Sequence, residues 1–311
     1  MKNNLIRIFT ITIFTSMFAF LAAASAKVNV VTSTPDLAAI TKEIGKDKVD
    51  VTSLAKGYQD PHFVDAKPSY VLKLNRADLL VKQGLDLEIG WLPVLITGSR
   101  NSKISSKDAS GYLDASTLLT NVLEVPEVPI DRSMGDIHPL GNPHYLLDPR
   151  NGVAVGKGIA ERLSEIDPGN SSFYIANYED FKKLMINKIA GWEQKLSGVK
   201  GFDIITYHKL WSYFDNWAGL KEVDTIELKP GIPPSPSHVA KLLTNAGSLD
   251  ICMVIAANYY PDKTARVVAE KLGVPFVSLP ASVGGTEDIK SYSDLFDTIV
   301  DRITSVSVGK K

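Results

Sequence analysis

One long amphipathic segment in the middle of the chain constrains the fold most. From Phe173 to Val199, apolar residues recur at three- and four-residue steps, which is typical of a single long helix. The spacing is not a strict heptad, so we expect this helix to pack on the rest of the chain and not in a coiled coil. Its expected inward-facing stripe is Phe173, Ile175, Tyr178, Phe181, Leu184, Met185, Ile189, Trp192 and Leu196.

The stretches on both sides of this segment alternate between strand and helix patterns. "VNVVTS", "PDLAAITKEIG" and "VDVTSLA" begin the first stretch, and "FDIITY", "KLWSYFDNWAG" and "VDTIEL" begin the second. Such alternation predicts parallel sheets covered by helices. We therefore predict an α/β fold of two lobes with mainly parallel sheets, joined by one long spine helix. The predicted divisions are an N-terminal lobe at 27–150, a linker region with the spine helix at 151–199, and a C-terminal lobe at 200–311.

Residues 1–26 are predicted to be a cleaved secretory signal peptide. Lys2 and Arg7 precede an apolar stretch that ends in Ala24-Ser25-Ala26, the small-x-small pattern of a cleavage site. Cleavage is favoured over a transmembrane anchor because polar Lys27 follows directly. No cysteine stands at the end of the signal to carry a lipid, so we expect a soluble protein of the periplasm.

Charge and cysteine content narrow the class of protein further. Without the signal peptide the chain carries 32 basic and 35 acidic side chains, a balance that argues against nucleic acid as a partner. The single cysteine, Cys252, lies in the apolar run "DICMVIAA". We expect it to be a buried hydrophobic residue and not a nucleophile.

Three of the five histidines follow strands or turns. His62 comes after the second strand in "GYQDPHF", His144 follows the turn "GNP", and His208 directly follows the strand "FDIIT". The carboxyl ends of strands in open α/β sheets gather ligand-binding groups. Two of these histidines belong to the first lobe and one to the second, so they can meet only in the cleft between lobes. Three imidazoles suit zinc and leave one position of a tetrahedron open, although each histidine alone also fits an ordinary turn or cap.

These motifs resemble the zinc- and manganese-specific periplasmic solute-binding proteins of ABC importers, the ZnuA/TroA-like family. The resemblance runs from "VVTSTPDLAAITKEIG" through "DPHF", "NPHYLLDP" and the spine helix to "TYHKLWSYF". It places the family's first three metal ligands on His62, His144 and His208. Manganese-type members commonly carry an acid at the third position, so His208 favours Zn²⁺ as the transported ligand over Mn²⁺.

The resemblance also implies a role. It implies a monomeric, non-catalytic protein that captures metal with high affinity and delivers it to an ABC transporter membrane permease. A periplasmic metallochaperone is a further candidate partner. The family's long histidine-rich acidic loop is missing, since residues 119–142 contain a single histidine. We therefore expect no metal scavenging by such a loop.

The chain departs from the family at the fourth ligand. The family usually has an aspartate after the last strand, but "SLPASVGG" has Pro280 at that point. We prefer His138 as the replacement, because a six-residue loop through Pro139 and Gly141 could fold back to bring it beside His144. The alternatives left open are Asp60, Glu227, Asp288 and a water molecule.

Other polar and aromatic residues are assigned supporting places. Asp60, Asp65 and Asp148 are candidates for orienting the ring N–H groups of the ligands. His238 is expected outside the site, at the start of a helix capped by Ser235 or Ser237. The weaker candidates for the walls of the cleft are Tyr207, Tyr259, Tyr260 and Asn258.

Two other classes of function stay open at this point. A zinc-dependent hydrolase would have water in the fourth position and an acid as general base, but the chain has neither an HExxH motif nor a histidine-carboxylate cluster close in sequence. A binder of manganese, haem or an iron chelate could share the spine-helix architecture, but haem and chelate sites depend on Tyr, Arg and Trp more than on three histidines. For a histidine site we expect affinity to fall as the pH drops through the titration range of histidine.

Overall fold

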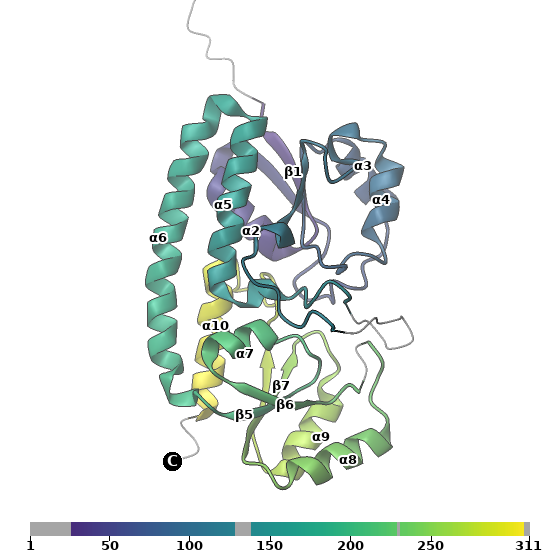
Figure 1. Cartoon of the computed structure of the whole chain (residues 1–311), viewed down its shortest axis with the longest axis vertical. Coiled ribbons are helices and arrows are strands. Elements are labelled where there is room, and N and C mark those ends of the chain that lie inside the picture. Colours follow the sequence, from purple (N-terminus) through teal and green to yellow (C-terminus); the bar gives the residue numbers. More distant parts are fainter. Residues whose placement is uncertain (1–25, 128–137, 229–230, 308–311) are drawn as a thin grey trace, which may run out of the picture.

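The computed structural model describes residues 26–127, 138–228 and 231–307. The predicted signal peptide lies outside these ranges except for Ala26. Within them, two lobes lie one above the other along a long helix (Figure 1). No described helix is both long and apolar enough to cross a membrane.

The first lobe is built on a four-stranded sheet in the order β2-β1-β3-β4, in which every strand pair is parallel. Successive residues of its strands point to opposite faces: Val30 packs toward α2 and α5, while Val31 packs toward α3 and α4. Both faces are therefore covered by helices. The elements are β1 (Val28–Thr32), α2 (Pro35–Gly45), β2 (Val49–Ser53), α3 (Pro68–Asn75), β3 (Leu79–Lys82), α4 (Leu92–Ser99), β4 (Tyr112–Asp114) and α5 (Pro149–Ile166).

The second lobe has the same strand arrangement, β6-β5-β7-β8, again with parallel pairs only. Ile204 faces a core shared with α7 and α10, and Ile205 faces α8 and α9. The elements are β5 (Asp203–Thr206), α7 (Ser212–Ala218), β6 (Lys221–Thr225), α8 (Pro236–Ala246), β7 (Ile251–Ala257), α9 (Asp262–Leu272), β8 (Phe276–Leu279) and α10 (Tyr292–Ser307).

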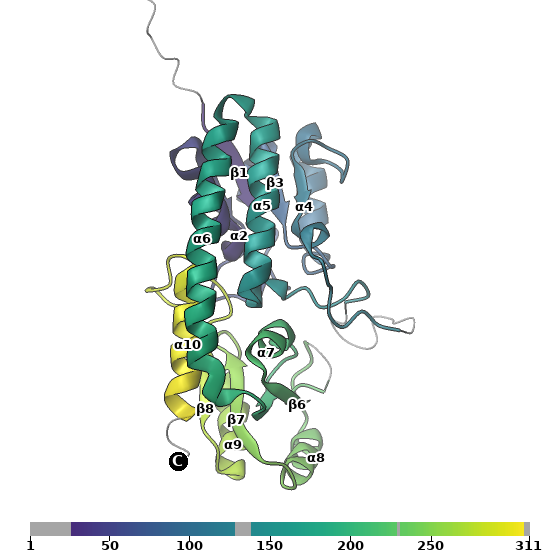
Figure 2. The same ribbon diagram turned by 60° about the vertical axis from the view of Figure 1, so that its left-hand side comes forward.

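The spine helix α6 (Ser171–Leu196) runs beside both lobes (Figures 1 and 2). It is antiparallel to its neighbour α5, and its buried residues belong to one hydrophobic core that extends from the first sheet to the second. The predicted architecture of two parallel-sheet lobes joined by a long helix is thus confirmed.

The predicted stripe of this helix was wrong at two positions. Ile175 and Leu184 are 40% and 44% exposed, while Tyr174, absent from the prediction, is fully buried. The residues that are buried follow a narrow line of three-, four- and seven-residue steps, because α5, α2 and α10 all pack on this one side of the helix. The flanks that carry Ile175 and Leu184 are left to solvent.

Two regular elements were missed by the sequence patterns. Helix α4 and the three-residue edge strand β4 were not predicted, because neither shows a clear period over its short length. Short 3-10 helices connect the larger elements: η1 (Lys46–Lys48), η2 (Ser102–Ile104), η3 (Ala115–Leu118), η5 (Tyr145–Leu147), η6 (Pro168–Asn170) and η7 (Ser197–Val199).

The two lobes touch where the carboxyl ends of their strands face each other. Asp36, in the first turn of α2, accepts hydrogen bonds from Ser282 Oγ at 2.7 Å and from the Val283 amide at 2.8 Å. Gly57 lies so close to the backbone around Gly284 that a Cβ atom would not fit there. The two lobes are therefore in direct contact on this side of the cleft.

Candidate metal centre

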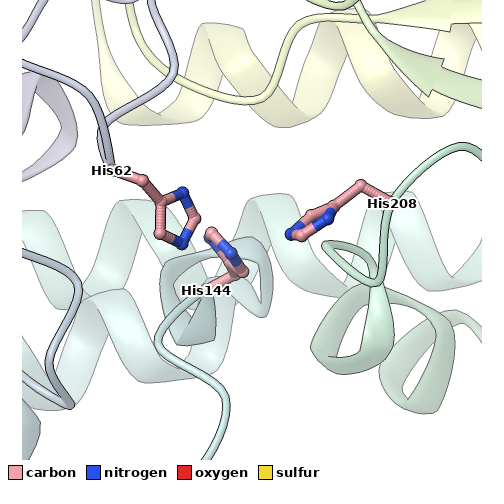
Figure 3. Close-up of side chains that lie close together, drawn as sticks. All are labelled: His62, His144 and His208. Carbon is pink, nitrogen blue, oxygen red and sulfur yellow. The ribbon is translucent and has the colours of Figure 1, made fainter. Parts of the chain in front are cut away.

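Three of the predicted ligands lie together between the lobes. His62 is in the loop between β2 and α3, His144 precedes η5, and His208 follows β5. One ring nitrogen of each lies within 4.8 Å of the corresponding nitrogens of the other two, and the rings point toward one another (Figure 3). Ligand nitrogens of a tetrahedral zinc ion are about 3.4 Å apart, as follows from bonds of about 2.1 Å. A small contraction would therefore bring all three rings onto one ion.

His138 lies beside this group. Its Nε2 is 3.0 Å from the Nε2 of His62, and its ring centroid is 6.4 Å from that of His144. The Gly141 amide donates to the His138 carbonyl at 3.1 Å, which closes a tight turn, and Gly141 has a φ of 106° that favours glycine. The loop through Pro139 and Gly141 thus folds back, but it brings the His138 ring nitrogen to His62 and not to His144, and the group of ring nitrogens within 4.8 Å of one another does not include His138.

Asp60 fixes the orientation of His62. One oxygen, Oδ1, accepts from the His62 amide at 3.0 Å and from the ring Nδ1 at 2.7 Å. Burial opposes ionisation of Asp60, but the hydrogen bonds and positive potential of His62 outweigh it and hold the pKa of this carboxyl below 3.8. With its Nδ1–H donated, His62 presents the lone pair of Nε2 to the cluster.

Glu227 does the same for His208. Its Oε2 accepts from the ring Nδ1 of His208 at 2.8 Å, and both side chains are only 6% exposed. Glu227 follows β6, the neighbour of β5, and its amide pairs with the Tyr207 carbonyl at 2.9 Å. Among the fourth-ligand alternatives, Glu227 and Asp60 are therefore placed as partners of ligand rings.

The remaining two imidazoles are neutral and have lone pairs to offer. The ring of His138 donates to the Leu85 carbonyl, and burial, together with His62 and His208 nearby, lowers the pKa of His138 to about 3. Burial and the same neighbours also hold the pKa of His144 well below 6.5. His144 Nε2 is buried without a hydrogen-bond partner among the described residues.

The ring nitrogens of this group suit a cation. With its Nδ1 donated to Asp60, His62 turns the lone pair of Nε2 toward the Nε2 of His138 at 3.0 Å. A metal ion between the rings would accept this lone pair and would also satisfy His144 Nε2. The donor set therefore fits a divalent ion that accepts nitrogen ligands.

Two expected orienting residues were assigned wrongly. Asp148 caps α5 by accepting from the Arg150 amide, and it binds the Arg150 side chain at 2.6 Å. Asp65 is exposed and lies 3.9 Å from Lys67. Neither is bonded to a ligand ring, because each has a nearer partner on its own segment.

The other candidates also find partners outside the cluster. Asp288 is exposed and is not among the grouped residues. The Asn258 side chain donates to the Gly285 carbonyl at 2.7 Å. His238 lies 3.2 Å from the Thr225 carbonyl, and Ser235 caps its helix.

Sequence reasoning missed the Leu85 carbonyl and the orienting role of Glu227. Leu85 has a φ of 51°, a left-handed conformation that cannot be predicted from a leucine in the sequence, because leucine rarely adopts it. Glu227 could have been predicted from the sequence, since it follows β6, the strand next to β5, which precedes His208.

A family model described as "Zinc-uptake complex component A periplasmic" (ZnuA) matches residues 30–306. The chain belongs to this family. Its members are substrate-binding proteins of metal ABC transporters that work with a membrane permease and an ATPase, and are not enzymes. The family therefore removes the support for a zinc hydrolase.

Individual relatives and solved structures agree on the fold and differ in the metal they name. The manganese ABC transporter substrate-binding lipoprotein PsaA of Streptococcus pneumoniae is 26% identical over 258 residues, which cover 81% of this chain and 79% of the relative. The crystal structure of ZnuA superposes with a TM-score of 0.73 at 23% identity, covering 90% and 99% of the two chains. The binding protein FpvC of Pseudomonas aeruginosa in complex with Mn²⁺ gives 0.74 at 20% identity, covering 92% and 100%.

Proposed function

We propose that this chain binds Zn²⁺ between its lobes and delivers it to the permease of an ABC importer. The observation that carries the proposal is an all-nitrogen donor set. Asp60 and Glu227 each accept a ring N–H group of a proposed ligand, so we expect the ion to meet imidazole only. Imidazole suits zinc, whereas manganese prefers carboxylate, carbonyl and water oxygens.

His62, His144 and His208 are the proposed ligands, and His138 is the proposed fourth. It takes the place that Pro280 cannot fill, since proline has no side-chain donor. The carboxyl groups of Asp60 and Glu227, behind His62 and His208, would offset the double positive charge of the ion through the rings, without entering its coordination sphere.

Capture would join the lobes. Three of the ligands belong to the first lobe, and His208 alone belongs to the second, so binding an ion draws the second lobe toward the first. Helix α6 packs on both lobes and limits their swing. The closed form would dock on the permease, and reopening there would release the ion.

The proposed place of action follows from the signal-like segment at residues 1–26. We propose a secreted, soluble, monomeric protein of the periplasm that works with the permease, with a periplasmic metallochaperone as a further candidate donor of zinc.

The test is metal competition on the metal-stripped protein. We expect one equivalent of Zn²⁺ to stay bound against an excess of Mn²⁺, as measured by equilibrium dialysis and elemental analysis. Displacement of zinc by manganese would overturn the choice of metal, and failure to retain either ion would overturn the site.

The ligand assignment has its own test. We expect His144→Ala and His138→Ala each to weaken zinc binding by about tenfold or more, and His238→Ala, outside the cluster, to leave it unchanged. A loss at His144 with no change at His138 would remove His138 from the ligand set.

A further inference from the structure

A tyrosine of the second lobe reaches the carboxylate that orients His62. Tyr260 lies between the end of β7 and the start of α9, and its hydroxyl donates to Asp60 Oδ2 at 3.3 Å. Asp60 uses its other oxygen, Oδ1, for the His62 ring. One carboxylate thus receives a hydrogen bond from each lobe.

The ring of Tyr260 is held in place on the second lobe. It stacks on Tyr207 with centroids 4.8 Å apart and planes inclined by 25°, and its centroid is 5.7 Å from that of His208. Tyr207 immediately precedes His208 in the chain. The ring of Tyr260 therefore packs beside His208 of the second lobe, while its hydroxyl binds Asp60, which orients His62 of the first lobe.

Among the residues that the structure describes, the other hydrogen bonds between the lobes do not end on Asp60 or Glu227, the carboxylates that orient ring nitrogens. Asp36 binds Ser282 and Val283, and the hydroxyl of Tyr292 donates to the Leu146 carbonyl at 2.6 Å. These contacts hold the lobes together, but they do not act on the rings of His62 or His208. The bond between Tyr260 and Asp60 is different because it ends on an orienting carboxylate.

We propose that Tyr260 is a positioning residue which, through the hydrogen bond of its hydroxyl to Asp60, couples closure of the lobes to the alignment of His62. This inference rests on the proposed metal-binding function. When the lobes close, Asp60 gains a second donor that fixes its rotamer and with it the His62 ring. When they open, the bond breaks, and His62 is held less firmly at the moment of release.

The coupling predicts a kinetic effect of Tyr260→Phe. This variant keeps the stacked ring and removes only the hydroxyl. We expect zinc to dissociate about three- to tenfold faster, less than the 10- to 100-fold that loss of a direct ligand partner costs, while the association rate stays within about twofold. Dissociation is measured by stopped-flow transfer of zinc to a chromogenic chelator, with Tyr58→Phe, an exposed tyrosine of the first lobe, as the matched control.

A double-mutant cycle separates positioning from packing. In an Asp60→Ala background, Tyr260→Phe should cause no further change in zinc dissociation, because its partner is gone. An equal effect in both backgrounds would overturn the proposal, and so would an unchanged dissociation rate for Tyr260→Phe alone. If the metal-free Tyr260→Phe protein melts at a lower temperature than metal-free wild type, and this destabilisation explains all of the faster zinc dissociation, the hydroxyl has a structural role instead. Zinc retention by the wild-type protein is measured first. If the wild type does not retain zinc, the proposed function is wrong, and this outcome is distinct from an unchanged dissociation rate in Tyr260→Phe.

Discussion

The buried carboxylate of Asp36 should give the protein a measurable pH dependence of stability. Burial raises the pKa of Asp36 from 3.8 to about 6, although hydrogen bonds from Ser282 and Val283 oppose the rise. Between these two values the folded protein keeps a proton that the unfolded chain has lost. The free energy of unfolding must therefore fall as the pH rises, by about 1.4 kcal/mol per pH unit.

The size of the effect follows from the shift. A difference of about two pKa units is worth about 3 kcal/mol, absent below pH 3.8 and fully developed above pH 6. Asp36→Asn has no proton to lose at this position. Stability of the variant relative to wild type should therefore rise by about 2 kcal/mol between pH 4.5 and 7.5.

Urea denaturation of the metal-stripped proteins at several pH values measures this difference. Subtracting the two curves removes the titration of all other groups, which both proteins share. Ser282→Ala serves as a companion variant: it deletes a donor that favours the ionised form, so it should raise the pKa of Asp36 further and extend the fall in stability to higher pH. The reasoning would be refuted if the difference in free energy of unfolding did not change with pH, or if wild type became more stable relative to Asp36→Asn as the pH rises.

Three further predictions concern the metal centre. His138→Gln should weaken zinc binding but leave the pH slope of affinity between pH 5 and 7 unchanged, because a group with a pKa of about 3 releases no proton there; a changed slope in isothermal titrations would contradict this. Glu227→Gln should lower zinc affinity about tenfold with unchanged stoichiometry in chelator competition, since the ring of His208 loses its carboxyl partner. Unaltered affinity would deny Glu227 that role. Gly141→Ala should destabilise the protein by about 1–3 kcal/mol in chemical denaturation and also weaken zinc binding. The φ of 106° is strained for alanine, and the added Cβ would collide with Val122. A fully stable variant would show that the turn adapts.

The metal centre combines neutral imidazole rings with carboxylates bonded to their far nitrogens. His62, His144 and His208 come together around one point, with His138 as the proposed fourth ligand. The carboxylates of Asp60 and Glu227 lie against the Nδ1 atoms of His62 and His208. The rings of His62 and His208 are fixed before the ion arrives, which lowers the entropy cost of binding. His138 is held by a backbone carbonyl instead and contributes no extra charge.

The sequence by itself determined the layers of this protein and the neighbourhood of its ligands. Strand and helix periods are local properties of the chain, so both parallel sheets and the spine helix could be read from runs such as "FDIIT" and from the spacing around Phe181. The carboxyl ends of parallel strands meet at one edge of a sheet, which is why His62 and His208 could be expected at a common cleft.

Only the tertiary structure decided which groups support those ligands. Glu227 reaches His208 because their strands are neighbours in the second sheet. Tyr260 reaches Asp60 across the cleft, and this bond joins residues 200 positions apart. The Leu85 carbonyl points at His138 because of a left-handed backbone that leucine rarely adopts. Hydrogen-bond partners depend on distances between remote segments and on the sign of single dihedral angles, and neither of these is encoded in a local pattern of apolar and polar residues.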